Sequence, residues 1–414
     1  MKLPKYSIGT GDRFGCQGKA LLRAIKQAEK NGLEIAIVWN KSYREHLITK
    51  TTPLDVLEEA QNAVDELKWR GNYYIDADHI NLSNVDLFIE SSTFFTIDVA
   101  EFIGKMAPKD KIQAFTEKYK KFQGKFFIPN IKKQFNVSKK QLKEIAEKYL
   151  LAVKEAAKIY KKIEMKKGRE NFIIEISMDE ANEPQTPIDI FFILAIIAEE
   201  NIPIQTFAPR LYGRFNKGID YQGDVNRFAR EFDYLLAVIQ YATEKFSLLD
   251  NLKLSIHSGS DKFSIYRIIN NAIKKFDVGI HLKTSGTTWL EELIGLAISG
   301  EEGLIITKEI YNKVYSRLNE LCLPYATVID IKKENLPPPE IVNNWTGEEY
   351  RRTLCHDLSS KDYNPDFRQI LHVGYKIAAE MRSRYLKAIR KYENIIAQRV
   401  TENIYENHIK KVFF

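Results

Sequence analysis

Several carboxylates and histidines of this chain stand within or directly after short apolar runs. Asp76, Asp78 and His79 follow the run YYI. Glu175 lies within FIIEISM, and His257 follows KLSI. An unpaired carboxylate on a buried strand is costly, or takes up a proton, unless a metal, a base or a substrate hydroxyl compensates it. Singly, each side chain is more often structural, but their repetition at run ends favours one site that transfers protons and binds a metal.

The ligand types indicate which ion such a site would hold. Mixed imidazole and carboxylate ligands suit a divalent cation such as zinc, manganese, nickel or iron. The three cysteines are widely spaced and provide neither a disulfide framework nor a structural zinc site. In DADH, strict alternation would send Asp76 and Asp78 to one face and His79 to the other, unless the chain turns after Asp78. The sequence leaves both arrangements open.

Basic side chains near the same run ends indicate that the substrate carries an acidic group. The loops SGSDK (258–262) and KTSGTT (283–288) each lead from an apolar run into an expected helix. Backbone N–H groups at helix starts bind anions, although ordinary capping by Ser258 and Thr287 is an alternative. The candidate substrate-binding residues are Arg13, Lys262, Lys283 and His281.

The apolar runs also predict the fold that positions these residues. Each run is followed by a helical pattern, which implies parallel strands with right-handed crossovers. Eight such units predict an α/β protein with a (β/α)8 TIM-type barrel, whose site lies at the carboxyl ends of the strands. A doubly wound sheet is the alternative, but GTGDRFG matches its glycine-rich fingerprint poorly. The expected strands are Tyr6–Gly11, Glu34–Trp39, Asn72–His79, Phe94–Asp98, Phe172–Glu180, Ile202–Arg210, Leu252–His257 and Val278–Thr284.

Two segments exceed a minimal barrel. Residues 99–171 separate the fourth and fifth expected strands and contain a helical pattern over Lys139–Lys162, so we expect an inserted helical excursion there. Beyond residue 300 the pattern is helical, and Tyr375–Val412 reads as one long amphipathic helix. The expected domains are therefore a catalytic barrel, 1–300, and a helical C-terminal extension packed on it, 301–414.

Composition limits the partners. The net charge of +7 arises largely where lysines alternate with glutamates at helical spacing, which is typical of solvated helix faces rather than of a nucleic-acid groove. The chain has no apolar run of about 18 residues and no apolar signal core at its start. We expect a cytoplasmic protein with a small-molecule substrate, without nucleic-acid or membrane partners, and with a possible homo-oligomeric contact along the C-terminal helix.

Eight segments, in their order along the chain, resemble the tagaturonate epimerases of hexuronate catabolism. The resemblance spans Gly9 to about Tyr375, and DADH and IHSGSDKFS are its most specific parts. It implies a metal-dependent isomerase that interconverts D-tagaturonate and D-fructuronate, which are C4 epimers. The segments are GTGDRFG, DADH, FFTID, EISMDE, GIDYQGD, IHSGSDKFSIY, HLKTSGT and RQILHVGY.

The resemblance also implies roles for individual residues. His79 and His257 correspond to metal ligands, and Asp220 in GIDYQGD is expected as the third, with Asp224 as the other carboxylate of that segment. Asp78 corresponds to the proton acceptor and Glu175 to the proton donor. Because C4 is β to the ketone, its hydrogen is not acidic, and we expect epimerisation by retro-aldol cleavage and re-formation of the C3–C4 bond.

The chain departs from the family pattern at a few places. VAEFIG follows TID where the family has a histidine, and GCQGKAL stands in place of a proline-containing turn. Family members also carry a further segment before the GTGDR element, at which this chain almost begins. The first alternative is therefore a sibling metal-dependent keto-sugar isomerase or epimerase with another substrate. The second is a non-catalytic sugar or polyanion binder.

Overall fold

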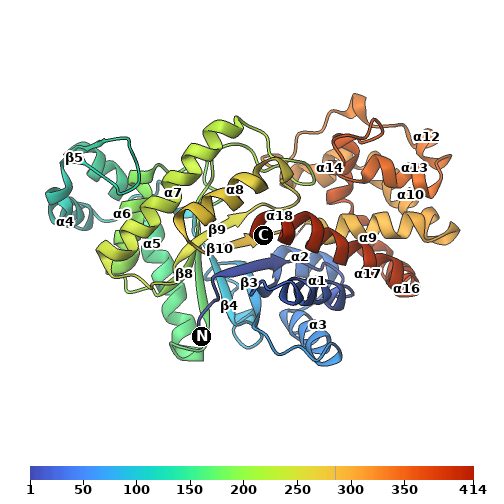
Figure 1. Cartoon of the computed structure of the whole chain (residues 1–414), viewed down its shortest axis with the longest axis horizontal. Coiled ribbons are helices and arrows are strands. Elements are labelled where there is room, and N and C mark those ends of the chain that lie inside the picture. Colours follow the sequence, from blue (N-terminus) through green and yellow to red (C-terminus); the bar gives the residue numbers. More distant parts are fainter. Residues whose placement is uncertain (285) are drawn as a thin grey trace.

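The computed structural model describes residues 1–284 and 286–414, and within them eight parallel strands close into a barrel (Figure 1). Their order around the barrel is β1-β10-β9-β8-β7-β4-β3-β2. The predicted (β/α)8 fold is confirmed. The strands are β1 (Tyr6–Thr10), β2 (Ala36–Ser42), β3 (Tyr73–Ile80), β4 (Phe94–Asp98), β7 (Ile173–Ser177), β8 (Ile204–Ala208), β9 (Lys253–His257) and β10 (Ile280–Lys283).

Helices cover the outside of the barrel, and their starts follow from local sequence. Thr186 and Asp189 form a capping box at α6, whose first residue is Pro187. The Asp224 side chain accepts hydrogen bonds from the backbone of Asn226 and Arg227 and so caps α7. The surrounding helices are α1 (Gly18–Lys30), α2 (Tyr43–Thr49), α3 (Pro53–Glu66), η1 (Val85–Leu87), α5 (Lys139–Lys167), α6 (Pro187–Glu199), α7 (Val225–Phe246), α8 (Phe263–Phe276) and α9 (Thr287–Ile298).

The barrel interior changes from apolar to charged along its axis. A small apolar cluster, separate from the main core, fills the amino end; it consists of Leu3, Ala36, Val38, Tyr74, Phe94 and Ile173. Lys253 lies at the same end and donates to the backbone carbonyls of Pro4 and Lys5. Inward-facing positions alternate along a strand, so Asp76 of β3 and Glu175 of β7 follow next. The buried carboxylates of the barrel interior therefore lie on the carboxyl side of the apolar cluster.

The insertion between β4 and β7 is not entirely helical. It contains a short antiparallel hairpin, β5 (Gly124–Phe126) with β6 (Phe135–Val137), next to η2 (Ala100–Phe102), α4 (Lys109–Tyr119) and η3 (Lys120–Phe122). Aromatic rings of this insertion pack on α6, with Phe126 and Phe191 4.9 Å apart between ring centroids. Figure 1 shows the insertion and the C-terminal helices on opposite sides of the barrel.

The C-terminal extension packs back on the barrel, with α17 against α1 and α9 and α18 against α8. The expected single helix over Tyr375–Val412 is wrong. Arg382 has φ 46° and ψ −118° and separates α15 from α16. The apolar spacing continues across this break because each piece keeps a face on the barrel. The elements are α10 (Glu301–Ser316), α11 (Leu318–Cys322), η4 (Leu323–Tyr325), η5 (Lys333–Asn335), α12 (Pro339–Asn343), α13 (Gly347–Leu354), α14 (Pro365–Val373), α15 (Tyr375–Met381), α16 (Ser383–Lys391), α17 (Glu393–Glu402), η6 (Asn403–Ile409) and α18 (Lys410–Phe413).

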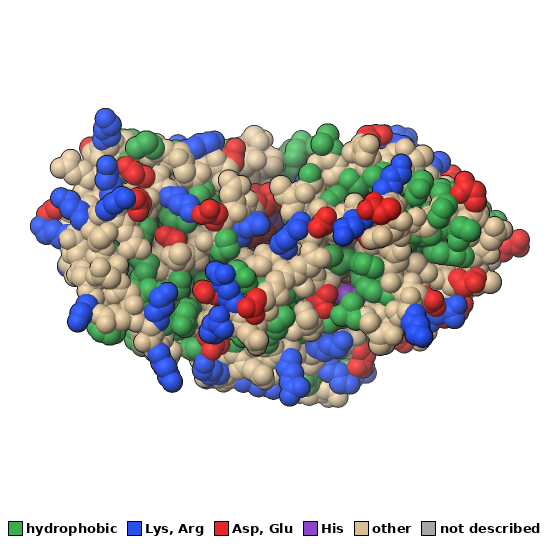
Figure 2. All heavy atoms as spheres, turned by 90° about the horizontal axis from the view of Figure 1, so that it is seen from above, with side chains coloured by type: hydrophobic (Ala, Val, Ile, Leu, Met, Phe, Trp, Pro, Cys, Tyr) green, Lys and Arg blue, Asp and Glu red, His purple; other side chains and the backbone are tan. Residues whose placement is uncertain are grey.

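The surface carries charges of both signs. Figure 2 shows lysines and arginines interspersed with acidic side chains over one face of the molecule. Many are paired on helices, for example Lys143 with Glu147 on α5. Within the described residues, none of the helices has the length and apolarity needed to cross a membrane.

Candidate active site

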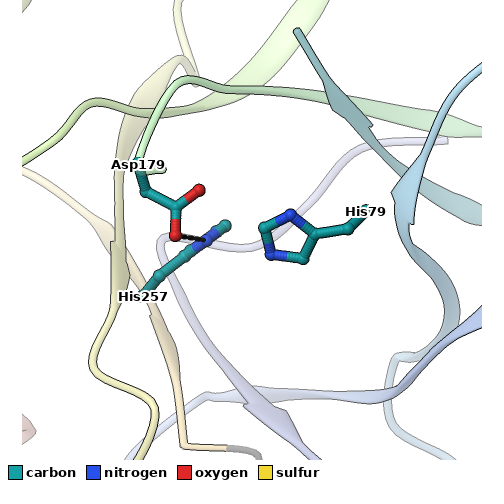
Figure 3. Close-up of side chains that lie close together, drawn as sticks. All are labelled: His79, Asp179 and His257. Atoms are coloured by element: carbon teal, nitrogen blue, oxygen red, sulfur yellow. Dashed lines mark ion pairs between the residues drawn. The ribbon is translucent and has the colours of Figure 1, made fainter. Parts of the chain in front are cut away.

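His79, Asp179 and His257 meet at the carboxyl end of the barrel (Figure 3), and one donor atom from each lies within 4.8 Å of the others. His79 belongs to β3, but its φ of 52° breaks the strand alternation. The pairing of β3 with β4 shifts in register between Ala77 and Ile80, at the same place. The chain therefore turns after Asp78, and His79 faces the mouth of the barrel.

In each of the two histidines, one ring nitrogen contacts a carboxylate that lies outside the group of His79, Asp179 and His257. His79 Nδ1 lies 3.3 Å from Asp98 Oδ2, and His257 Nε2 lies 2.8 Å from Glu175 Oε1. The ring nitrogens that these two contacts do not use are Nε2 of His79 and Nδ1 of His257. Within the described residues, His257 Nδ1 has no aligned hydrogen bond, although Asp179 Oδ2 lies 3.0 Å away. Metal-binding histidines characteristically orient themselves through such outer carboxylates, so these residues fit a divalent cation.

The electrostatics of the trio favour a cation. Burial lowers the pKa of His257, but the Asp179 and Glu175 carboxylates outweigh it and raise this pKa to about 9. The pKa of His79 is likewise raised well above its usual value by Asp78 and Asp179, against the effect of burial. The carboxylates thus hold protons on the imidazoles, and a divalent ion would displace these protons on binding.

Next to the trio, the buried Lys283 ammonium holds several carboxylates together. Its Nζ lies 2.8 Å from Asp76, 2.9 Å from Asp78 and 3.1 Å from Glu175, and it donates to Thr96 Oγ1 at 2.6 Å. Burial raises the pKa of Asp76 to about 7. Burial also acts on Asp78, but Lys283 and His79 prevail and lower its pKa to about 2. Neighbouring carboxylates therefore differ in proton affinity, as acid–base chemistry requires.

Lys283 and His281 were both expected to bind substrate. The Lys283 ammonium is instead engaged by the carboxylates just described. His281 lies deeper in the barrel, fully buried, with Nδ1 2.9 Å from Ser7 Oγ. Burial lowers the pKa of His281 to about 3, so this imidazole is neutral. Substrate binding by either residue stays a prediction. The expected loop at 283–288 includes residue 285, which lies outside the described residues.

Lys262 is already engaged by protein acceptors. Its Nζ donates to the carbonyl of Ile219 at 2.8 Å, to Ser260 Oγ at 2.9 Å and to the carbonyl of Asp261 at 3.2 Å. The side chain is fully buried, and burial lowers its pKa to about 7. Lys262 therefore braces two loops, and its expected contact with substrate stays a prediction.

Arg13 is engaged in the same way. Its Nε donates to Glu45 Oε1 at 3.0 Å and its Nη1 to the His372 carbonyl at 3.3 Å. The guanidinium also lies over the Tyr375 ring, 4.1 Å from the centroid. Arg13 thus joins α2 to the C-terminal extension at the barrel mouth.

The structure does not bring Asp220 to the group of His79, Asp179 and His257. The Asp220 carboxylate accepts from the Ser264 backbone at 3.1 Å and from its hydroxyl at 3.0 Å, at the start of α8. The other expected carboxylate, Asp224, caps α7. The carboxylate beside the histidines is Asp179, two residues after β7. Its position four residues after Glu175 in EISMDE is the signal that could have identified it, because period-two alternation gives both the same face.

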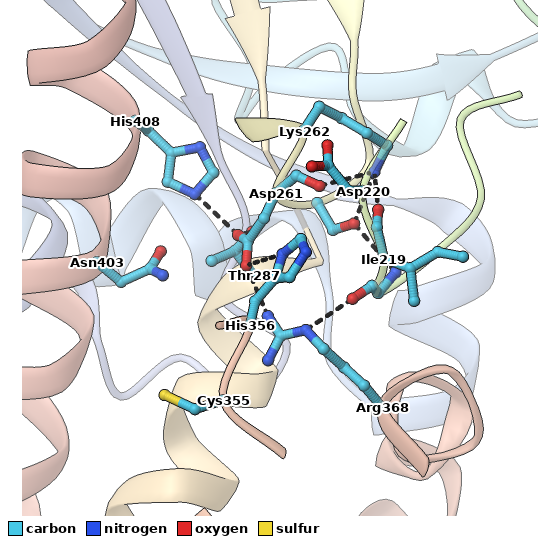
Figure 4. Close-up of polar contacts among 12 residues, drawn as sticks. Ile219, Asp220, Asp261, Lys262, Thr287, Cys355, His356, Arg368, Asn403 and His408 are labelled. Carbon is cyan, nitrogen blue, oxygen red and sulfur yellow. Dashed lines mark hydrogen bonds and ion pairs between the residues drawn. The ribbon is translucent and has the colours of Figure 1, made fainter. Parts of the chain in front are cut away.

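Asp261 is the centre of a second buried group, which the sequence did not single out (Figure 4). Its Oδ1 accepts from Thr287 Oγ1 and His408 Nε2, both at 3.0 Å. Its Oδ2 lies 2.7 Å from Arg368 Nη2 and 3.2 Å from His356 Nδ1. Arg368 pairs with Asp261 in full burial, and the group connects the loop after β9 to the C-terminal extension.

Comparison with known proteins agrees with this architecture. The model of the tagaturonate epimerase family matches residues 1–412. The tagaturonate/fructuronate epimerase of Thermotoga maritima is 28% identical over 414 residues, covering 97% of this chain and 79% of that protein. A glycerol-bound crystal structure of the fructuronate-tagaturonate epimerase of Cohnella laeviribosi superposes with a TM-score of 0.81 at 23% identity, covering 100% of this chain and 82% of that one. Its native structure gives a TM-score of 0.79. The chain therefore belongs to the tagaturonate epimerase family and is an enzyme of the epimerase class.

Proposed function

We propose that this enzyme interconverts D-tagaturonate and D-fructuronate by epimerisation at C4, with the help of a divalent metal ion. Its family membership supports the substrate. The observation that carries the proposal is the contact between the metal trio and the acid–base group. Glu175 is hydrogen-bonded to His257 at 2.8 Å and lies 3.1 Å from Lys283, which in turn contacts Asp78.

His79, Asp179 and His257 would hold the ion, which supplies Lewis-acid polarisation of the substrate ketone when bound. Asp78 is suited to accept the proton of the C4 hydroxyl, because Lys283 and His79 keep it ionised. Removal of this proton allows the C3–C4 bond to break: C4 becomes an aldehyde, and the electron pair of the bond passes to the C1–C3 fragment, whose ketone becomes an enolate. Re-formation of the bond on the opposite face of the aldehyde inverts C4.

Glu175 is suited to return a proton to the C4 oxygen. Burial raises the pKa of Glu175, but Lys283 and His257 outweigh it and lower this pKa well below its usual value. Glu175 therefore stores no proton of its own near neutral pH. It lies 3.1 Å from the Lys283 ammonium, so it can pass on a proton taken from that partner. The reverse reaction uses the same groups in exchanged roles.

A direct assay tests this function. The purified protein is freed of metal with a chelator and incubated in heavy water with D-tagaturonate and each of several divalent ions. We expect fructuronate to form only where an ion is restored, with no deuterium at C4. Deuterium at C4 would exclude the bond-breaking route, and exchange at C1 or C3 would indicate an isomerase that moves a proton between adjacent carbons. No product with any ion would refute the substrate assignment.

A further inference from the structure

The basic residues expected to bind the substrate carboxylate already form ion pairs or hydrogen bonds with protein groups. Arg13 is paired with Glu45. Lys262 donates to protein oxygens, and Lys283 neutralises the carboxylates inside the barrel. A substrate carboxylate approaching these cations would have to displace existing ion pairs or hydrogen bonds. Another cation at the mouth is therefore better suited to bind it.

Lys217 and Arg44 are two cations whose charged groups form no such ion pair or hydrogen bond among the described residues. Within residues 1–284 and 286–414, the Lys217 ammonium has no acceptor at hydrogen-bond distance and no carboxylate at salt-bridge distance. The Arg44 guanidinium, over the same residues, is engaged only with the Tyr325 ring, 5.0 Å from its centroid. Lys217 is partly buried, and burial lowers its pKa. A partly buried ammonium without an acceptor gains most from an anionic ligand.

Lys217 lies at the same end of the barrel as the metal trio. It belongs to the loop between β8 and α7, and its Nζ lies 3.2 Å from the position that a Cβ on Gly259 would take. Gly259 follows His257 by two residues at the end of β9. Asp179 of the trio and Glu180 both act electrostatically on Lys217, as does Arg44. The two cations therefore face the mouth beside the proposed metal.

The backbone around Lys217 is fixed on both sides. The Lys217 N–H donates to the carbonyl of Val328 in the extension at 2.8 Å. The N–H of the next residue, Gly218, donates to Ser260 Oγ at 3.0 Å, and the Gly218 carbonyl accepts from Arg368 Nε at 2.6 Å. The backbone that carries the Lys217 side chain is thus fixed before any ligand arrives, which reduces the entropy lost on binding.

We propose that Lys217, assisted by Arg44, binds the carboxylate of the sugar-acid substrate and makes the enzyme select uronates over neutral ketohexoses. This inference rests on the proposed function. In the substrate the carboxylate is C6, close to C4, so a fixed cation near the trio would also orient the carbon whose configuration changes. Binding at this point acts on substrate affinity and orientation and leaves the proton-transferring groups untouched.

The test compares Lys217→Met with wild type on D-tagaturonate and on tagatose, which carries a hydroxymethyl group in place of the carboxylate. We expect KM for tagaturonate to rise about 10- to 100-fold, as for the loss of a charged hydrogen bond, with a smaller change in kcat. Binding of tagatose, measured by calorimetry, should change little, so the preference for the acid collapses. Lys217→Arg should restore part of the affinity. Arg214→Met, which removes an exposed arginine of the same loop, is the matched control and should leave KM unchanged.

The outcomes separate this inference from the proposed function. Wild type that turns over tagaturonate, with unchanged KM and unchanged preference in folded Lys217→Met, overturns the role of Lys217. Wild type that neither binds nor converts tagaturonate overturns the proposed function instead. Should Lys217→Met fail to fold, Arg44→Met provides the same test on an exposed side chain. It should raise KM in the same direction, and an unchanged KM there overturns the inference.

Discussion

At the scale of single residues, the protonation of each group in the site depends on its charged neighbours. Lys283 holds Asp78 ionised while the neighbouring Asp76 keeps a pKa of about 7. Asp78, His79, Glu175 and His257 could be identified from sequence because polar groups on apolar strands need partners, and the structure does bring them together. Asp179 was not chosen as a ligand, although its spacing from Glu175 marks the same face, because the histidines beside it come from strands far away in the chain.

Replacing Glu175 by glutamine tests the proton-donor role. We expect turnover of tagaturonate to fall at least about 100-fold, since a general acid contributes this much. Metal content should stay close to that of wild type, because the ligand trio is intact. Steady-state kinetics and elemental analysis of the same preparation provide the measurement. Glu183→Gln, a substitution of an exposed glutamate in the loop that follows β7, should behave as wild type. Retained turnover in Glu175→Gln would exclude the assigned role.

At the scale of elements, the strands were the most predictable part. Their continuous apolar runs are typical of parallel strands buried on both faces. The hairpin of β5 and β6 was missed because strands of three residues carry too little pattern. The break at Arg382 was missed because apolar spacing continues through it. The turn of His79 into the mouth was left open by the sequence, and the positive φ of this residue settles it.

The third metal ligand is Asp179, in the loop after β7, according to the structure-based proposal, and Asp220, in the loop after β8, according to the family resemblance. We expect Asp179→Asn to weaken divalent-ion affinity at least about 10-fold, because it removes a charged donor from the trio. Asp220→Asn should leave ion affinity unchanged and lower thermal stability slightly, because Asp220 caps the start of α8. Competition with a chelator measures both affinities. The reverse ranking would make Asp220 the ligand, as the family resemblance implied.

At the scale of the whole molecule, the C-terminal extension completes the rim of the barrel. It supplies Arg368, His356 and His408 to Asp261, and it returns the chain to its start, where Phe413 lies 5.3 Å from Tyr6 between ring centroids. A barrel followed by helices could be predicted from periodicity, but this closure could not, because it depends on contacts between distant segments. The division into domains at residue 300 stays a prediction. Since the chain is an enzyme, the non-catalytic binder considered from its charge is not retained.

Stability against acid is a property of the whole chain. Burial lowers the pKa of His281 to about 3 and that of His46 to about 4, against 6.5 for an unperturbed histidine. Between the lowered pKa of each histidine and 6.5, that histidine is protonated in the unfolded chain but not in the folded chain. These two histidines therefore make the free energy of unfolding fall as the pH decreases below about 6.5. Each unit of pKa difference is worth about 1.4 kcal/mol when the group is fully buried, as His281 is.

The substitution His281→Gln should remove its part of this pH dependence. Urea unfolding at about pH 8 and about pH 4.5 gives the free energy of each protein under both conditions. We expect the loss between the two pH values to be smaller in the variant than in wild type, whatever its stability at the higher pH. An equal or larger loss in the variant would show that His281 is protonated in the folded state.

The position of Asp261 in the chain has a consequence for biosynthesis. Its carboxylate leaves the ribosome before Arg368, which follows 107 residues later, and before His408, which follows 147 residues later. Until both have been synthesised, the loop after β9 carries a negative charge that has no burial partner. The nascent barrel can form its strands, but its catalytic rim matures only when translation has reached the last helices.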